Sequence, residues 1–163
     1  MRLTRLKMKE KLFRKYLKVD SRAFLAGLFI LVSGIIGIHY FRLIEFPTDL
    51  TGYFDRGFYN QFGALAIAVE MMVAGIYLFL GHPKTNFVMA LFGFTVLADQ
   101  LFQFFGVFSS FITGYPIIVF FIFSLVSFWM VVKNPFKLRK ITWFAAMISF
   151  VLGNAVEVFF NVF

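Results

Sequence analysis

Cysteine is absent from this sequence, and proline and acidic residues are scarce. Without cysteine the chain can form no disulfide, no thiolate metal site and no cysteine nucleophile. Only 15% of the 163 residues are charged, whereas about 25% is typical of soluble domains. The sequence also contains no phosphate-binding glycine loop, no HExxH motif and no nucleophile elbow. We therefore expect no catalytic residue and no metal site, and an enzyme that works alone is not indicated.

Long apolar runs dominate the rest of the chain, which is 61% hydrophobic with a mean hydropathy of +0.85. Five of these runs come close to the ~20 residues that a helix needs to cross a bilayer. Backbone groups in lipid must satisfy one another, so runs of this length predict helices. The predicted spans cover about residues 24–44, 62–81, 86–108, 115–132 and 141–163. The expected fold is an all-α, polytopic transmembrane helix bundle formed by residues 23–163, preceded by a basic segment at 1–22.

Basic side chains are distributed unevenly around these spans. With five spans, fourteen of the sixteen lysines and arginines fall on one side, and only Arg42 and Arg56 fall on the other. The positive-inside rule makes the basic side cytoplasmic. We therefore expect a protein of the inner (cytoplasmic) membrane with a cytoplasmic N-terminus and its C-terminus outside. The net charge of +8 does not indicate nucleic acid, because the charge sits at the membrane ends of the spans.

The first 22 residues alternate basic and apolar side chains at near-helical spacing. This pattern is typical of an amphipathic helix that lies on an anionic leaflet, with its basic side chains reaching lipid phosphates. A flexible tail that only sets the topology is the alternative. The expected contacts with anionic lipid are Arg2, Arg5, Lys7, Lys11, Arg14, Lys15 and Lys18.

Polar side chains inside the spans are the best pointers to function, because ionisable groups are costly at membrane depth. Glu70 lies roughly 12 Å below the start of the second span, and Asp99 lies roughly 20 Å above the inner start of the third, at 1.5 Å per residue. In a core about 30 Å thick these two levels are similar. The predicted intramembrane polar site comprises Glu70, Asp99, Gln103, Asn154 and Glu157.

Two interpretations of these groups are open. The functional one is a site that handles a proton or binds a ligand, such as a quinone head or a cation. The structural one is a set of interhelical hydrogen bonds made by neutral carboxyls and amides. Where the first span leaves the membrane, His39 and Arg42 are candidate ligand or cofactor contacts. An interfacial histidine is the better explanation of His39, and an arginine that snorkels or pairs with Glu45 is the better explanation of Arg42.

Residues 64–102 resemble the central hairpin of the DoxX-like membrane proteins. The similarity rests on a glutamate in the second helix, small residues, a leucine-rich exit and a basic loop residue, here Glu70, Gly75, Leu78, Gly81 and Lys84. It extends over about residues 22–133, and the fifth span exceeds the family's usual four-helix core. The resemblance implies a four-helix bundle that is sometimes the small membrane subunit of a quinone-linked oxidoreductase. The residues themselves require no cofactor.

The sequence thus supports two functions. One is a non-catalytic membrane subunit of a larger complex, which is redox-linked if the resemblance holds. The other is a small proton or cation transporter or channel that uses Glu70 and Asp99, as a homo-oligomer.

The five-span topology predicts which connections are accessible from outside the cell. Single cysteines introduced at Thr48 and Thr113 should react with an impermeant maleimide applied to intact cells. Cysteines at Thr85 and Asn134 should react only after the membrane is permeabilised. Reaction at the connection between the second and third spans in intact cells would contradict the five-span topology.

Overall fold

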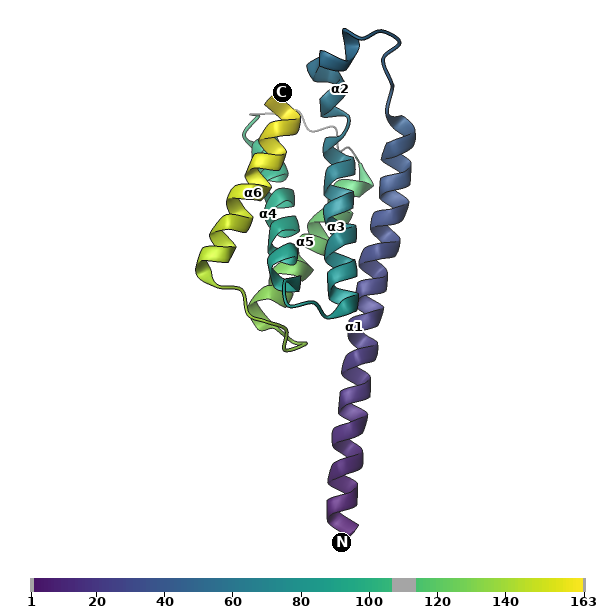
Figure 1. The fold of residues 1–163 in the computed structure, drawn as a ribbon, viewed down its shortest axis with the longest axis vertical. Coiled ribbons are helices and arrows are strands. Elements are labelled where there is room, and N and C mark those ends of the chain that lie inside the picture. The colour runs from purple at the N-terminus through teal and green to yellow at the C-terminus, as the bar shows by residue number, and fades with distance from the viewer. Residues whose placement is uncertain (1, 107–113, 163) are drawn as a thin grey trace.

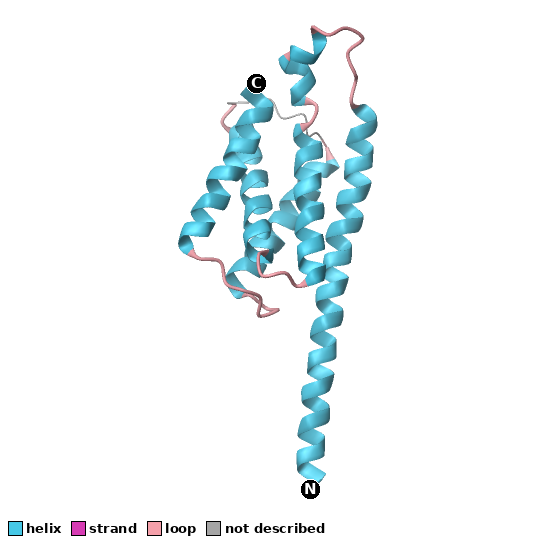
Figure 2. Ribbon diagram, viewed as in Figure 1, coloured by secondary structure: helices cyan, strands magenta, loops and turns pink. Residues whose placement is uncertain are grey.

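The computed structural model describes the backbone of residues 2–106 and 114–162, and their side chains except at 2–20, 56, 157 and 160–162. Every regular element in this part of the chain is helical (Figure 2). The elements are α1 (Arg2–Leu43), the 3-10 helix η1 (Gly52–Phe54), α2 (Arg56–Asn60), α3 (Gly63–Leu80), α4 (Thr85–Phe104), α5 (Tyr115–Lys133) and α6 (Trp143–Val162). The predicted all-α class is confirmed.

Four helical stretches are long and apolar enough to cross a membrane. They cover Ser21–Leu43, Gly57–Leu80, Thr85–Phe104 and Tyr115–Lys133, and they match the first four predicted spans to within a few residues, apart from the earlier start of the second at Gly57. Helix α6 lies where the fifth span was predicted. Among the described residues, the apolar part of α6 covers Trp143–Val156, which is shorter than a full span. The fifth crossing therefore stays a prediction.

Helix α1 is much longer than a single membrane crossing. Its 42 residues correspond to about 63 Å at 1.5 Å per residue, roughly twice the hydrocarbon thickness. Figure 1 shows the N-terminal half continuing the axis of the first span beyond the end of the bundle. The side chains of the predicted lipid contacts, Arg2 to Lys18, lie outside the described residues, so contact with anionic lipid stays a prediction.

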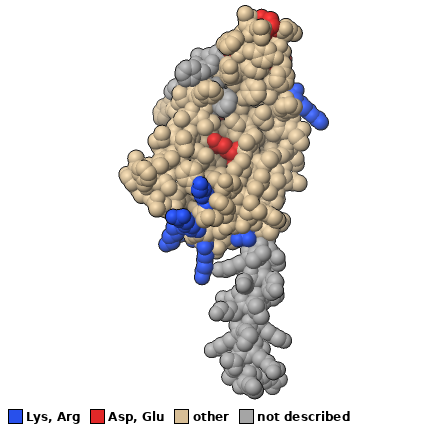
Figure 3. Space-filling model, in the orientation of Figure 1, with Lys and Arg blue, Asp and Glu red and all other residues tan. Residues whose placement is uncertain are grey.

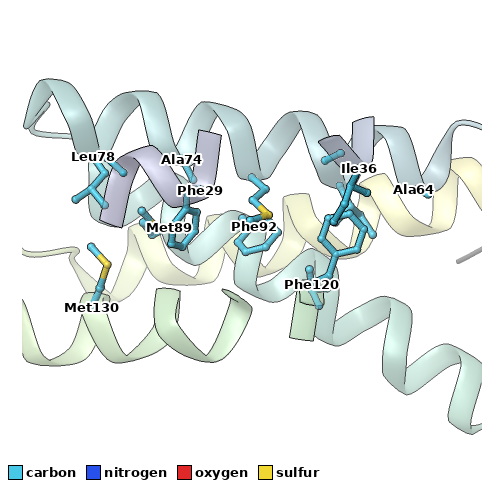
Figure 4. Packing of buried hydrophobic residues seen from close by; sticks show 14 of the residues in the cluster. Phe29, Ile36, Ala64, Ala74, Leu78, Met89, Phe92, Phe120 and Met130 are labelled. Atoms are coloured by element: carbon cyan, nitrogen blue, oxygen red, sulfur yellow. The ribbon is translucent and has the colours of Figure 1, made fainter. Parts of the chain in front are cut away.

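The helices form a bundle in which α4 packs against three other helices. Helix α3 packs on α1 and on α4, while α4 also packs on α5 and on α6 (Figure 1). At the centre, the ring of Phe29 on α1 meets Phe123 on α5 edge-on, with centroids 4.7 Å apart. Phe29 also meets Phe92 on α4, with ring centroids 6.2 Å apart (Figure 4). These contacts close α1, α3, α4 and α5 into a four-helix core, with α6 lying against α4.

The close approach of α1 to α3 depends on Gly75 of α3. A Cβ at Gly75 would lie 2.8 Å from Cβ of Phe29 and 3.1 Å from the backbone nitrogen of Ile30. Because backbone atoms cannot move aside locally, any larger residue here would push α1 away from α3. Small residues at such crossings are typical of membrane bundles.

The turn between α3 and α4 is tightly closed. The Thr85 hydroxyl lies 2.9 Å from the Tyr77 carbonyl oxygen and 2.6 Å from that of His82, and the side chain is fully buried. A cysteine at this position would therefore be hidden from reagents on both sides of a membrane. The exposed neighbour Lys84 is the better labelling position for this connection.

Candidate functional site

Glu70 lies in the middle of α3, in a span that otherwise carries no charged side chain. Its side chain is half-buried. One carboxylate oxygen, Oε2, is fully buried and has no hydrogen-bond partner. Figure 3 shows acidic atoms about halfway along the visible face of the bundle, with basic atoms gathered below them toward one end. An incompletely satisfied carboxyl at this depth is costly, because hydrocarbon supplies no water to complete its hydrogen bonds.

Thr95 on α4 is the side chain that interacts with the Glu70 carboxyl. Its hydroxyl is buried and lies 3.1 Å from the carbonyl oxygen of Leu91, one turn earlier in the same helix. A threonine hydroxyl carries a single hydrogen, so Leu91 and Glu70 compete for it. The carboxyl therefore has at most a shared donor in Thr95.

Helix α6 closes the other side of Thr95. A Cβ on Gly153 would lie 2.8 Å from the Thr95 backbone nitrogen and 2.9 Å from its hydroxyl oxygen. Glycine at this point lets α6 approach α4 closely, and the Ser149 hydroxyl, one turn earlier, lies 3.3 Å from the carbonyl oxygen of Phe87 on α4. Glu70 and Thr95 with Gly153 define what we call the Glu70 seam, where α3, α4 and α6 meet.

Asp99 follows Thr95 by one helical turn, on the same face of α4. It is only 3% exposed, and its Oδ2 accepts a hydrogen bond of 3.0 Å from the Gln100 side chain. Four residues along a helix correspond to about 6 Å, so Asp99 lies roughly one turn beyond the level at which α4 meets Glu70. Glu70, Thr95 and Asp99 thus form a polar line along the α3–α4 interface.

The predicted amide members lie apart from this line. Gln103 is exposed and, together with Gln100 and Phe121, lines a groove of about 500 Å³ beside α4 and α5. Asn154 donates a 2.8 Å hydrogen bond to the carbonyl oxygen of Phe150 in its own helix. The side chain of Glu157 lies outside the described residues, so its place in the site stays a prediction.

The two candidate ligand contacts at the end of α1 are both exposed. The ring of His39 packs edge-on against Tyr40, with centroids 5.4 Å apart. In the described part of the chain, Arg42 makes no ion pair with Glu45, and no group of three metal-ligating side chains occurs. His39 and Arg42 therefore have the geometry of an interface position, open to lipid head groups and water.

A groove of about 280 Å³ lies between α1 and α3. A quinone head bound there would need hydrogen-bonding groups in the lining. The lining is almost wholly apolar and includes Gly34, Gly37 and Ala68. Ser33 is the polar side chain in it, and its hydroxyl already lies 3.0 Å from the carbonyl oxygen of Ile30. The groove therefore does not fit a quinone head.

Two residues of the Glu70 seam were missed from sequence. Thr95 shares a helix face with Asp99 at a spacing of four, and Gly153 immediately precedes Asn154. Both signals were present, but threonine and glycine are common in membrane helices. Only the packing distinguishes these two from the others.

No protein-family model, no curated protein and no solved structure matches the chain. The DoxX-like resemblance therefore stays a prediction, and the site is argued from its own geometry.

The contact between Glu70 and Thr95 predicts an energetic coupling. Thr95→Val should cost about 0.5–1 kcal/mol in the wild-type protein and almost nothing in a Glu70→Leu background, because the shared hydrogen bond is then already absent. The cost of Thr95→Val in each background is measured as the change in the free energy of unfolding in mixed micelles. Ser124→Ala is the matched control, since that buried hydroxyl bonds only the Phe121 carbonyl oxygen of its own helix. Additive effects of Thr95→Val and Glu70→Leu would contradict the contact.

Proposed function

We propose that this protein is a non-catalytic membrane subunit that works within a larger membrane complex. The observation that carries the proposal is the Glu70 carboxyl, half-buried at mid-span with an oxygen that has no partner. A second membrane protein that packs over the Glu70 seam would supply polar groups to this carboxyl and remove it from lipid.

Glu70 differs from the other polar groups of the spans in its depth. Among the described residues, Arg22 Nε, Asn60 Oδ1 and Asn86 Oδ1 are also buried without a partner, but each lies in the first four residues of its span. The hydroxyls of Ser33, Ser124 and Ser149 lie within hydrogen-bonding distance of carbonyl oxygens in their own helices. The Asp99 carboxyl accepts from Gln100. Intramembrane acids normally face a bundle interior and pair there. For Glu70 we infer that this interior is completed by another subunit.

The proposal includes the topology. Five spans, with α6 as the fifth, give an inner-membrane protein whose basic end is cytoplasmic and whose C-terminus is outside. The charge distribution supports this, because the basic side chains of the two turns gather at one end of the bundle (Figure 3). The acids Glu45, Asp49 and Asp55 belong to the connection at the other end.

A proton or cation path is the alternative that the same site supports. The polar line of Glu70, Thr95 and Asp99 would provide successive stations along the α3–α4 interface. This function would use a homo-oligomer. In a single bundle these three polar groups line only one edge, so further copies would be needed to enclose the path. A redox-linked role rests on the DoxX-like resemblance alone.

Photo-crosslinking tests the subunit proposal. A photoreactive amino acid at Val73, one turn from Glu70 and half-buried on the same face, should crosslink to one discrete membrane protein in native membranes. The same probe at Ile122, which is 52% exposed on α5, should give mainly lipid adducts. Mass spectrometry of the products identifies the crosslinked protein and the lipid adducts.

Two outcomes would count against the proposal. If Val73 gives only lipid adducts, like Ile122, nothing covers the Glu70 seam. If Val73 crosslinks only to second copies of this chain, the homo-oligomeric transporter is favoured instead.

A further inference from the structure

A positively charged cavity lies at the basic end of the bundle, far from the Glu70 seam. Its volume is about 300 Å³, at the lower end of the range for small-molecule sites. Two segments distant in sequence line it, namely the start of α4 with the turn before it and the connection from α5 into α6. The lining residues are Pro83, Lys84, Phe87, Arg139, Lys140, Ile141, Thr142 and Ala145.

The charges around this cavity are of one sign. Lys84, Arg139 and Lys140 are all exposed. Among the side chains that the structure describes, every acid lies in a span or in the connection at the opposite end. Helix α4 begins at this cavity without a side-chain cap and without an acid in its first turn, so its positive end is not neutralised. The cavity therefore has the electrostatics of an anion site.

Hydrogen bonds hold the two walls of the cavity together. The buried Asn86 side chain donates a 2.9 Å bond to the carbonyl oxygen of Arg139 and thereby ties the α5–α6 connection to α4. Within that connection, Asn134 closes a loop by donating to the Leu138 carbonyl oxygen at 2.6 Å and accepting from its N–H at 2.8 Å. The basic residues are thus carried by a constrained backbone, which lowers the entropy lost when they bind a ligand.

The remaining wall is apolar and lies at the membrane interface. Phe87, Ile141 and Ala145 form it. Beside it Trp143 is 78% exposed, and Trp129, near the end of α5, is 52% exposed. Exposed tryptophans near helix ends are typical of the level of lipid head groups. A ligand here would meet basic groups on one side and hydrocarbon on the other.

We propose that this cavity binds the phosphate of an anionic phospholipid, with Lys84, Arg139 and Lys140 around the phosphate and the acyl chains leaving along Phe87, Ile141 and Ala145. The site does not depend on the proposed complex, and it differs from a general attraction of the basic end to the membrane surface. It is a pocket of defined lining, which should bind lipid with a fixed stoichiometry.

The experiment uses the full chain purified in mild detergent, with phosphatidylglycerol, phosphatidylcholine and inorganic phosphate as probes and native mass spectrometry as the readout. The wild-type protein should retain phosphatidylglycerol in preference to phosphatidylcholine. Arg139→Gln/Lys140→Gln should weaken phosphatidylglycerol binding by about thirtyfold, from the contribution of two basic residues near an anionic lipid. Lys133→Gln/Lys137→Gln removes the same charge from the same end outside the cavity, and should leave binding nearly unchanged.

Ala145→Phe tests the cavity itself, because it fills the apolar wall and keeps all three charges. It should abolish the preference for phosphatidylglycerol, with a thermal unfolding midpoint in detergent close to that of the wild-type protein. Equal losses in the two double variants, or full binding in Ala145→Phe, would overturn the proposal. Inorganic phosphate that competes as strongly as the lipid would assign the site to a free anion and overturn its assignment to lipid.

Discussion

The absence of water from the bilayer core is the constraint on which this structure depends. Every polar group at that depth must find its partner within protein. The backbone meets this demand by forming helices, and the short side chains meet it locally, as when Ser124 bonds a carbonyl oxygen of its own turn. Among the described residues, Glu70 is the mid-span group for which this local solution is incomplete. Its position at the junction of α3, α4 and α6 therefore gives the bundle one polar edge.

Glu70 and Asp99, the intramembrane acids whose side chains the structure describes, differ in how deeply they are buried. Asp99 is almost fully enclosed and accepts a bond from Gln100, as expected of a group that stabilises the bundle. Glu70 is only partly buried, next to a threonine whose single hydrogen is shared. A proton path needs both acids in one continuous polar route, whereas an assembly site needs only Glu70, the less buried of the two. The difference in exposure is what favours assembly here.

Much of the fold could be predicted from sequence because the bilayer sets helix length. The first four spans followed from apolar runs of about 20 residues, whereas the similar membrane levels expected for Glu70 and Asp99 stay a prediction. Helix rotation could not be predicted in this way, because it depends on contacts such as Gly153 against Thr95. For the same reason Gln103, expected inside the bundle, proved exposed. The pairing of the α3–α4 turn with the α5–α6 connection also required the structure, since Asn86 and Arg139 are 53 residues apart.

Carbodiimide modification of Glu70 tests the central claim most directly. An apolar carbodiimide reaches carboxyls through hydrocarbon, and mass spectrometry can quantify its adducts separately at Glu70 and Asp99. If another subunit covers the Glu70 seam, Glu70 should be protected in native membranes and modified in the purified chain in nanodiscs. Asp99, which is buried within the chain, should stay unmodified in both. Equal modification of Glu70 in native membranes and in nanodiscs would contradict the account.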